Sequence, residues 1–327
     1  MKDRKFQSHF AGDIINFVNE KRALGFKYDV EEYYLMKFDQ LCLKRFPSQT
    51  ILTDEIMSAW IVKTESETKK TLRNRTTPVI DLAKYLNRQG QKAFILPSGT
   101  LPKAHRYVPY IFSHEELRVL FNEFDLKQVE ISDKITNSHL VPSVFFRLLY
   151  CCGLRPGEAR RLQLEDVNLA DGTIKIIDSK NHKDRIVVMS DDVRLMCVHY
   201  RNALFKTKLA HSPWFFPSRT GEAYTINWVN ITFREAIRKT NIGQNSPNPP
   251  RAYDLRHTFA THRLYQWMRE DKDLYTVLPY LSAYMGHADF SSTEYYIHFV
   301  PGIFEQMSGF DFSCYEKLLP EVNVYEL

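Results

Sequence analysis

A short run of prolines and glycine most constrains how this chain of 327 residues can fold. Residues 97–109 contain three prolines and one glycine. Proline lacks a backbone N–H and disfavours a helical residue before it, so no continuous helix can pass through this stretch. The chain length also suits about two domains of roughly 150 residues each. We therefore predict a domain boundary near residue 105, with one domain over residues 1–105 and a second over residues 106–327.

The first domain has the pattern of a helical domain. Apolar residues recur near the helical period in four stretches, which are residues 10–24, residues 30–46, a segment that begins after its cap Thr53, and residues 67–87. The second stretch is expected to bury Tyr33, Phe38 and Leu43. Pro78 lies inside the fourth stretch, where we expect a kink or a break.

The second domain is expected to be mainly helical with one small sheet. Ser113 and Glu116 form a capping box, in which each side chain accepts a backbone N–H of the other residue. Residues 173–177 and 185–189 are rich in β-branched residues and flank the polar turn 181–184, which predicts a β-hairpin. The predicted fold class is therefore mainly α with a small β-hairpin or sheet (α+β).

Positive charge is concentrated in the first part of the chain. Residues 1–106 hold 19 Lys and Arg against 12 Asp and Glu, whereas the remainder holds 25 against 27. A basic part joined to a near-neutral part fits a nucleic acid gripped by both. No apolar run reaches the length of about 18 residues that spans a membrane, and the charged N-terminus is unlike an export signal. We expect a cytoplasmic protein with no membrane partner.

Five cysteines are scattered through apolar sequence. Their number is odd, and no CxxC or Cys/His spacing typical of zinc is present. We expect reduced thiols, no disulfide and no metal site. The cysteines are Cys42, Cys151, Cys152, Cys197 and Cys314.

Two arginines are candidate phosphate ligands. Arg155 precedes Pro156, which can open a helix, and Glu158, which can hold the guanidinium. Arg256 begins an apolar-rich segment. A lone arginine at a helix start is more often a surface residue, but two guanidinium forks can clamp phosphate oxygens and stabilise a pentacoordinate phosphorus. The pair therefore indicates phosphoryl-transfer chemistry.

Three further groups complete a set that can break and rejoin a phosphodiester. Lys180 lies on the hairpin turn and can protonate a leaving oxygen, with Lys183 as the alternative. His287 can donate to a phosphate oxygen. Tyr295 and Tyr296 are adjacent, and a tyrosine becomes a nucleophile when cationic neighbours favour its phenolate. Taken singly, such residues are more often a solvated lysine, a capping histidine and packed tyrosines. The assignment to phosphodiester chemistry therefore depends on their occurring together in this order along the chain.

The order of these segments resembles the tyrosine recombinase (phage integrase) family over essentially the whole chain. Residues 112–117 resemble the usual opening of that family's catalytic domain. The resemblance implies a helical core-binding domain over residues 1–105 and a tyrosine recombinase catalytic domain over residues 106–327. The segments that carry it are residues 153–158, 179–185, 254–262, 286–287 and 293–298.

The resemblance implies a role for each candidate. Arg155 and Arg256 would form the phosphate clamp, His287 would be a second phosphate ligand, and Lys180 would be the general acid. The nine-residue gap after His287 assigns the nucleophile to Tyr296. The resemblance also implies a 3′-phosphotyrosyl intermediate, double-stranded DNA recombination sites as partners, and no metal or nucleotide cofactor.

One position departs from the family pattern. The family usually has histidine three residues before the second arginine, whereas this chain has Tyr253. A phenol does not titrate near neutral pH in the way that an imidazole does. We expect this departure to lower the reaction rate, and it fits a divergent mobile-element integrase better than a housekeeping resolvase.

Two further regions are expected to act in assembly on DNA. The basic residues of the fourth helical stretch are expected to face a DNA groove and to give salt-dependent affinity, with Arg73 and Arg75 as the favoured contacts. The apolar segment 302–327 is expected to pass to a neighbouring protomer in a homo-tetramer, or else to close its own core. The basic residues are Lys69, Lys70, Arg73 and Arg75.

Three functions remain open on the sequence. The favoured one is a site-specific DNA recombinase that integrates or excises a mobile element. A type IB-like topoisomerase would use the same chemistry to relax supercoils. A DNA-binding accessory homologue without catalysis is the third, and the presence of both arginines, the lysine and the tyrosine speaks against it.

Overall fold

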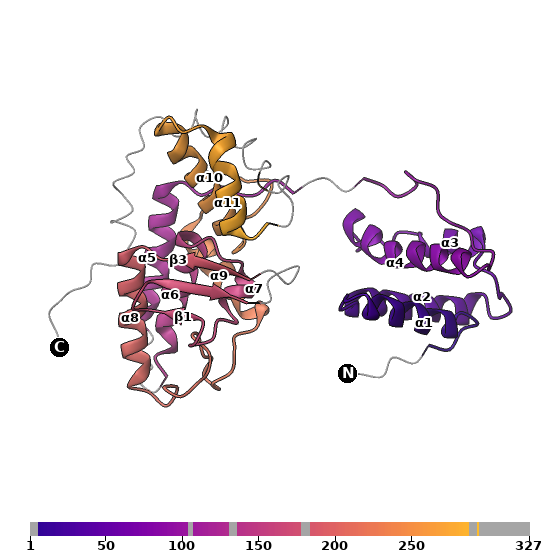
Figure 1. Cartoon of the computed structure of the whole chain (residues 1–327), viewed down its shortest axis with the longest axis horizontal. Coiled ribbons are helices and arrows are strands. Elements are labelled where there is room, and N and C mark those ends of the chain that lie inside the picture. Colours follow the sequence, from indigo (N-terminus) through magenta and orange to yellow (C-terminus); the bar gives the residue numbers. More distant parts are fainter. Residues whose placement is uncertain (1–5, 104–106, 131–135, 178–183, 288–292, 294–327) are drawn as a thin grey trace. The chain divides into compact units, whose positions relative to one another are not determined.

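The chain forms two compact units, Met1–Tyr107 and Val108–Leu327 (Figure 1). Each unit has its own hydrophobic core. The predicted fold class, mainly α with a small antiparallel sheet, is confirmed. None of the helices described has the length and apolar character needed to cross a membrane. This computed structural model describes residues 6–103, 107–130, 136–177, 184–287 and 293.

In its described residues, the first unit packs four helices around an aromatic core. Phe17, Phe38 and Trp60 are buried in it, and the rings of Phe38 and Trp60 meet edge to face at 5.4 Å. Thr53 caps the third helix as predicted, since its side chain accepts the backbone N–H of Ile56. The helices are α1 (Ala11–Ala23), α2 (Asp29–Arg45), α3 (Asp54–Trp60) and α4 (Lys69–Arg88).

The buried face of α2 differs from the predicted one. Phe38 is buried as expected, but Tyr33 and Leu43 are each 39% exposed, and Leu35 and Cys42 occupy the core. The buried positions follow the i, i+3, i+7 spacing of one helical stripe, which leaves Tyr33 on the opposite face and Leu43 at the edge. The prediction for these two side chains was therefore wrong.

Pro78 does not break α4, which continues from Lys69 to Arg88 with Pro78 inside it. The pyrrolidine ring is buried, as are Val79 and Leu82 on the same helix. Packing of this apolar face compensates the backbone hydrogen bond that proline cannot make. Of the predicted kink or break at this position, the break is therefore wrong, because the helix is continuous.

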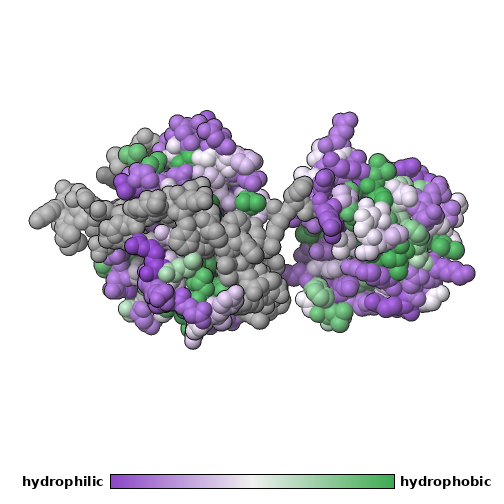
Figure 2. Space-filling model, turned by 90° about the horizontal axis from the view of Figure 1, so that it is seen from above, coloured by the Kyte–Doolittle hydropathy of each residue, from purple (hydrophilic) through white to green (hydrophobic). Residues whose placement is uncertain are grey.

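The surface of the first unit is mixed. On the face seen in Figure 2, hydrophilic residues border separate hydrophobic patches. Leu24, Phe26 and Val30, around the turn between α1 and α2, are each more than half exposed. Scattered apolar exposure of this kind is ordinary for a folded surface.

The second unit is built around α6, whose first ten residues are all buried. It packs against α5, α8 and α10. The predicted capping box opens α5, because Ser113 N donates to Glu116 Oε2 at 2.8 Å and Glu116 N donates to Ser113 Oγ at 3.1 Å. The helices are α5 (His114–Glu130), η1 (Ser138–Leu140), α6 (Val141–Cys151), α7 (Pro156–Ala159), α8 (Asp191–Phe205), α9 (Ile226–Thr240), α10 (Asp254–Arg269) and α11 (Leu274–Met285).

The sheet has three antiparallel strands in the order β1-β2-β3, namely β1 (Val167–Asn168), β2 (Thr173–Ile176) and β3 (Arg185–Val188). The predicted hairpin is therefore confirmed, and β1 is an addition to it. Ile174 pairs with Val187, and both side chains face the core. The turn that carries Lys180 and Lys183 lies outside the described residues. Arg185, just after this turn, is the first residue of β3.

The described cysteines are free thiols in or beside the two cores. Cys42, Cys152 and Cys197 are buried, and Cys151 is partly buried. Burial raises the pKa of Cys42 and Cys197 to about 12, so these thiols stay protonated. Cys314 lies outside the described residues. Within the described ranges, no group of three or more His, Cys, Asp or Glu side chains is arranged to hold a metal ion.

Candidate active site

Arg256 lies in the first turn of α10 and its side chain is fully buried. Its Nη1 donates to the carbonyl of Gly153 and its Nη2 donates to the carbonyl of Met285. The first carbonyl precedes α7 and the second ends α11. Arg256 therefore joins two segments that are far apart in the sequence. The alternative that Arg256 is an exposed surface residue is excluded.

Arg155 is the N-cap residue of α7 and is held from two sides. Its Nη1 donates to Glu158 Oε1 at 2.6 Å, which confirms the predicted contact, and its Nη2 donates to the carbonyl of Gly286 at 2.7 Å. The carbonyls of Met285 and Gly286 thus receive Arg256 and Arg155 respectively. Because these acceptors belong to successive residues, the two guanidinium groups lie close together at the end of α11.

His287 follows directly and joins the same cluster. Gly286 has a φ of +64° and ends α11 in the left-handed conformation, and the N–H of His287 donates to the Ser282 carbonyl at 3.0 Å. His287 Nδ1 lies 2.7 Å from Thr293 Oγ1. Burial, followed by the charges of Arg256 and Arg155, lowers the pKa of His287 to about 3. The imidazole is therefore neutral at pH 7, and its Nδ1 shares a hydrogen bond with the Thr293 hydroxyl.

Glu158 is the anionic centre of the cluster and has a second partner, Arg185. Arg185 Nη2 donates to Glu158 Oε2 at 2.7 Å and Nη1 donates to Oε1 at 3.0 Å. Burial alone would raise the pKa of Glu158, but the hydrogen bonds and charges of Arg185 and Arg155 outweigh it and lower the pKa to about 2. The carboxylate is ionised and shared between two arginines.

Tyr253 lies beside this cluster, just before α10, and is 37% exposed. Burial alone would lower the pKa of the Arg155 guanidinium. Glu158, and then the Tyr253 hydroxyl, outweigh burial and raise this pKa. The rings of Tyr253 and His257 lie 5.0 Å apart. Burial and the charges of Arg256 and Arg251 lower the pKa of His257 to about 4, so this histidine is also neutral at pH 7.

The structure therefore brings together Arg155, Arg256, His287 and Tyr253 of the predicted set. Lys180 and Tyr296 lie outside the described residues, and so does the segment 302–327. Arg185 and Thr293 lie in segments that carry the family resemblance, but no contact between them and the candidates was predicted, because no local spacing connects them. The cluster presents fixed positive charge beside a neutral imidazole, which suits a bound phosphate whose negative charge increases during reaction.

The four basic residues predicted on α4 have different surroundings. Lys69, Lys70 and Arg73 are exposed. Arg75 instead donates through Nε to Glu67 Oε1 at 2.5 Å and through Nη2 to the Val62 carbonyl at 3.0 Å, and its guanidinium lies 4.6 Å from the Trp60 ring. Arg75 thus closes the loop between α3 and α4, and the structure does not support it as a favoured DNA contact.

Substitution of Arg75 and of Arg73 is expected to separate these two roles. Arg75→Gln leaves the largely buried Glu67 without its cation and is expected to lower the free energy of unfolding by about 3 kcal/mol. Arg73→Gln is expected to change the free energy of unfolding by less than about 0.5 kcal/mol. It is also expected to reduce by about 1 the slope of the logarithm of the duplex binding constant against the logarithm of the salt concentration. Urea unfolding and binding titrations at several salt concentrations measure both effects. Weaker DNA binding by Arg75→Gln at unchanged stability would restore it as a DNA contact.

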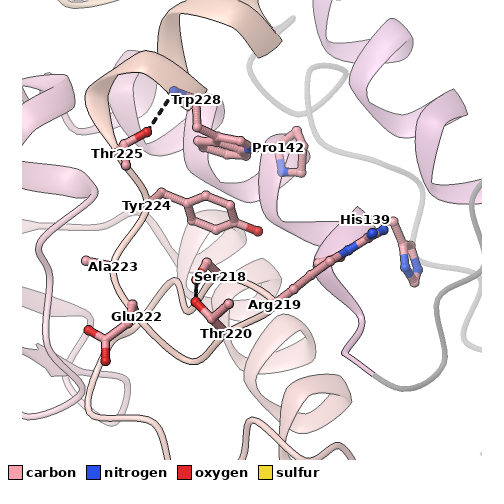
Figure 3. A pocket seen from close by; sticks show the side chains of 11 residues that line it. His139, Pro142, Ser218, Arg219, Thr220, Glu222, Ala223, Tyr224, Thr225 and Trp228 are labelled. Carbon is pink, nitrogen blue, oxygen red and sulfur yellow. Dashed lines mark hydrogen bonds between the residues drawn. The ribbon is translucent and has the colours of Figure 1, made fainter.

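A groove of about 640 Å³ lies apart from the arginine cluster, between the start of α6 and the loop before α9 (Figure 3). The rings of Tyr224 and Trp228 stack at 3.8 Å on one wall, and Arg219 extends toward His139 across the groove. The described residues that line it include none of the predicted catalytic residues.

The fold with this cluster is that of a tyrosine recombinase catalytic domain. The solved structures it resembles include the XerH site-specific recombinase bound to a palindromic difH substrate, with a TM-score of 0.65, 19% identity and coverage of 94% of this chain and 90% of that one. The Tn1549 transposon integrase in complex with a circular intermediate DNA gives a TM-score of 0.63 at 12% identity, with 90% and 99% covered.

The sequence comparisons agree with the fold. The profile described as the phage integrase family matches residues 111–301, and the chain belongs to this family. A putative integrase/recombinase, y4rB, of Sinorhizobium fredii is 28% identical over 309 residues, which cover 91% of this chain and 96% of that protein. The tyrosine recombinase XerC of Staphylococcus epidermidis is 30% identical over 199 residues, or 60% of each chain.

Proposed function

We propose that this chain is a site-specific DNA recombinase that integrates or excises a mobile element through a 3′-phosphotyrosyl intermediate. The observation that carries the proposal is the attachment of Arg155 and Arg256 to the successive carbonyls of Gly286 and Met285, with His287 next to them. The relatives support it, because they include a putative integrase/recombinase and a transposon integrase solved with DNA.

The proposed reaction assigns one step to each residue. Tyr296 first loses its phenol proton to solvent, and the phenolate oxygen attacks the phosphorus of the scissile phosphodiester while the bond to the 5′-oxygen breaks. Lys180 gives its proton to the departing 5′-oxygen. Arg155, Arg256 and His287 stabilise the negative charge that builds up on the non-bridging oxygens. The reverse step, with a new 5′-hydroxyl as the nucleophile, rejoins the strands.

The described contacts support a clamp that is in place before DNA binds. Both arginines are already oriented by protein carbonyls and by Glu158, so less reorganisation is needed in the transition state. Tyr253 lies beside Arg155 and fits a hydrogen-bond donor to the same phosphate. His257, neutral at pH 7, is its neighbour rather than a charged replacement for the family's usual histidine.

The partners in this proposal are double-stranded recombination sites. Lys69, Lys70 and Arg73 are the cations of α4 proposed to contact DNA phosphates, because their side chains are exposed on one helix. Assembly as a homo-tetramer on DNA, through the segment 302–327, is part of the proposal. Two of the similar solved structures, both of the XerH recombinase, are described as bound to difH substrates.

A covalent-trapping assay tests the function. Wild type, Tyr296→Phe and the matched neighbour Tyr295→Phe are incubated with nicked duplexes from the DNA that flanks the gene, and SDS-resistant adducts are scored. We expect adducts with wild type and Tyr295→Phe and none with Tyr296→Phe, because only the phenol oxygen can form the phosphotyrosyl bond.

Other outcomes would redirect the proposal. Adducts that persist in Tyr296→Phe would show that the nucleophile is misassigned. Salt-sensitive binding without adducts would favour the accessory DNA-binding protein. Relaxation of a supercoiled plasmid that lacks the flanking sequences would favour the topoisomerase.

A further inference from the structure

Arg185 is a third arginine of the site, and it contacts the segments on either side of the phosphate clamp. It is the first residue of β3 and its side chain is only 7% exposed. Its Nη1 and Nη2 donate to the two oxygens of Glu158 at 3.0 and 2.7 Å, and its Nε donates to the carbonyl of Tyr284 at 2.9 Å. One planar group thus joins β3, α7 and the end of α11.

Each of these segments leads directly to a candidate catalytic residue. Glu158 also binds the Arg155 guanidinium, so Arg185 and Arg155 share one carboxylate. The Tyr284 carbonyl lies at the end of α11, immediately before the carbonyls that hold Arg256 and Arg155. Arg185 itself follows the hairpin turn in which Lys180 lies. Displacement of Arg185 would therefore act on the clamp from both sides.

The turn at Gly286 is packed against the same side chain. A Cβ atom at Gly286 would meet the Cδ and Nη1 atoms of Arg185 at 3.0 Å, and the φ of +64° already disfavours a side chain there. Arg185 therefore fills the space that glycine leaves open. His287 follows this turn, so its position depends on the Arg185 side chain as well as on Thr293.

We propose that Arg185 is a positioning residue that sets the geometry of Arg155 and His287 and couples it to the hairpin that carries Lys180. This inference rests on the proposed recombinase function for its catalytic consequence. Arg185 acts through Glu158 and the Gly286 turn rather than on DNA, since its contacts are with protein groups. Arginine is required because three donors in one plane reach three acceptors, whereas the lysine ammonium is a point charge that cannot reproduce this fork.

Single-turnover adduct formation tests the catalytic consequence. Arg185→Lys and Arg185→Gln are compared with wild type and with Arg118→Gln, a matched control on α5 whose side chain is 44% exposed and pairs with Glu115. We expect both Arg185 variants to lower the rate of adduct formation by about 100-fold and to change the dissociation constant for the duplex by less than about twofold. Arg118→Gln is expected to match wild type in both measurements. Circular dichroism and thermal unfolding establish that the variants are folded.

The titration of His287 in the DNA-free protein provides a second readout. Arg185 is one of the charges that lower the pKa of His287, after burial, Arg256, Arg155 and His257. The midpoint of the His287 ring signal, followed by nuclear magnetic resonance, is therefore expected to move to higher pH in Arg185→Gln and to stay in place in Arg118→Gln.

The two readouts separate this inference from the proposed function. A wild-type rate in Arg185→Lys, or a rate loss explained by weaker DNA binding, would overturn the positioning role. If wild type itself forms no adduct, the proposed function fails, and the His287 titration then decides the matter alone. Because Arg185→Lys keeps the positive charge, a His287 midpoint that moves in this variant supports the positioning role, and a midpoint that stays at the wild-type value rejects it.

Discussion

Arg256→Lys is expected to lower strand cleavage by about 1000-fold and the free energy of unfolding by about 3 kcal/mol. The Arg256 side chain is fully buried and donates to the carbonyls of Gly153 and Met285 from two different nitrogens. A lysine ammonium is a single centre, so it cannot serve both carbonyls and a phosphate in the same geometry. Single-turnover adduct formation and urea unfolding measure the two effects.

Arg269→Lys is the matched control for this prediction. Arg269 is the last residue of the same helix, α10, and its side chain is exposed. We expect it to leave both the cleavage rate and the stability close to those of wild type. A wild-type cleavage rate in Arg256→Lys would remove Arg256 from the clamp. A slow but fully stable variant would show that its carbonyl contacts contribute little to folding.

Glu158→Gln is expected to lower the free energy of unfolding by about 3 kcal/mol at pH 7. The substitution leaves Arg155 and Arg185 facing a neutral amide in a largely buried site. It should also slow adduct formation, because Arg155 loses the group that orients it. Urea unfolding at pH 7, 5 and 3 measures the stability of the variant and of wild type.

The stability difference between wild type and Glu158→Gln should depend on pH in a definite direction. The pKa of Glu158 is about 2 in the folded protein and about 4.5 as an ordinary glutamate. A carboxyl group whose pKa is lower in the folded state stabilises the folded protein fully at a pH above its unfolded-state pKa. This contribution is lost as the pH falls toward the folded-state pKa. The gap between the two proteins should therefore be largest above about pH 5 and narrow toward pH 2 to 3.

Glu165→Gln provides the control, since Glu165 is exposed in the same region of the sequence. Its stability should stay within about 0.5 kcal/mol of wild type at each pH. A gap for Glu158→Gln that remains constant from pH 7 to pH 3 would contradict the lowered pKa of Glu158.

Local features of this protein were predictable because their causes lie within a few residues. The Ser113–Glu116 capping box, the Thr53 cap and the Arg155–Glu158 contact each join residues three positions apart, and one turn of helix brings such residues together. The hairpin followed in the same way from two β-branched runs around a polar turn. These short-range predictions were confirmed.

The wrong predictions concern side chains whose surroundings come from other elements. Tyr33 and Leu43 fit a helical period, but packing against α4 and its neighbours decided which stripe of α2 is buried. Pro78 was expected to kink or break a helix, yet α4 continues through it with its apolar face buried. Local pattern defines a set of faces, and tertiary packing selects one of them.

The sequence by itself determined that the chain has two parts, which residue types are available for chemistry, and in what order they occur. Only the tertiary structure decided that Arg155 reaches a carbonyl 131 residues away, that Arg256 is buried, and that Arg185 shares Glu158 across 27 residues. The physical reason is that a guanidinium binds whichever acceptors the fold presents. Arg75 shows the same rule, since α3 and Glu67 supply its acceptors and hold it within the first unit.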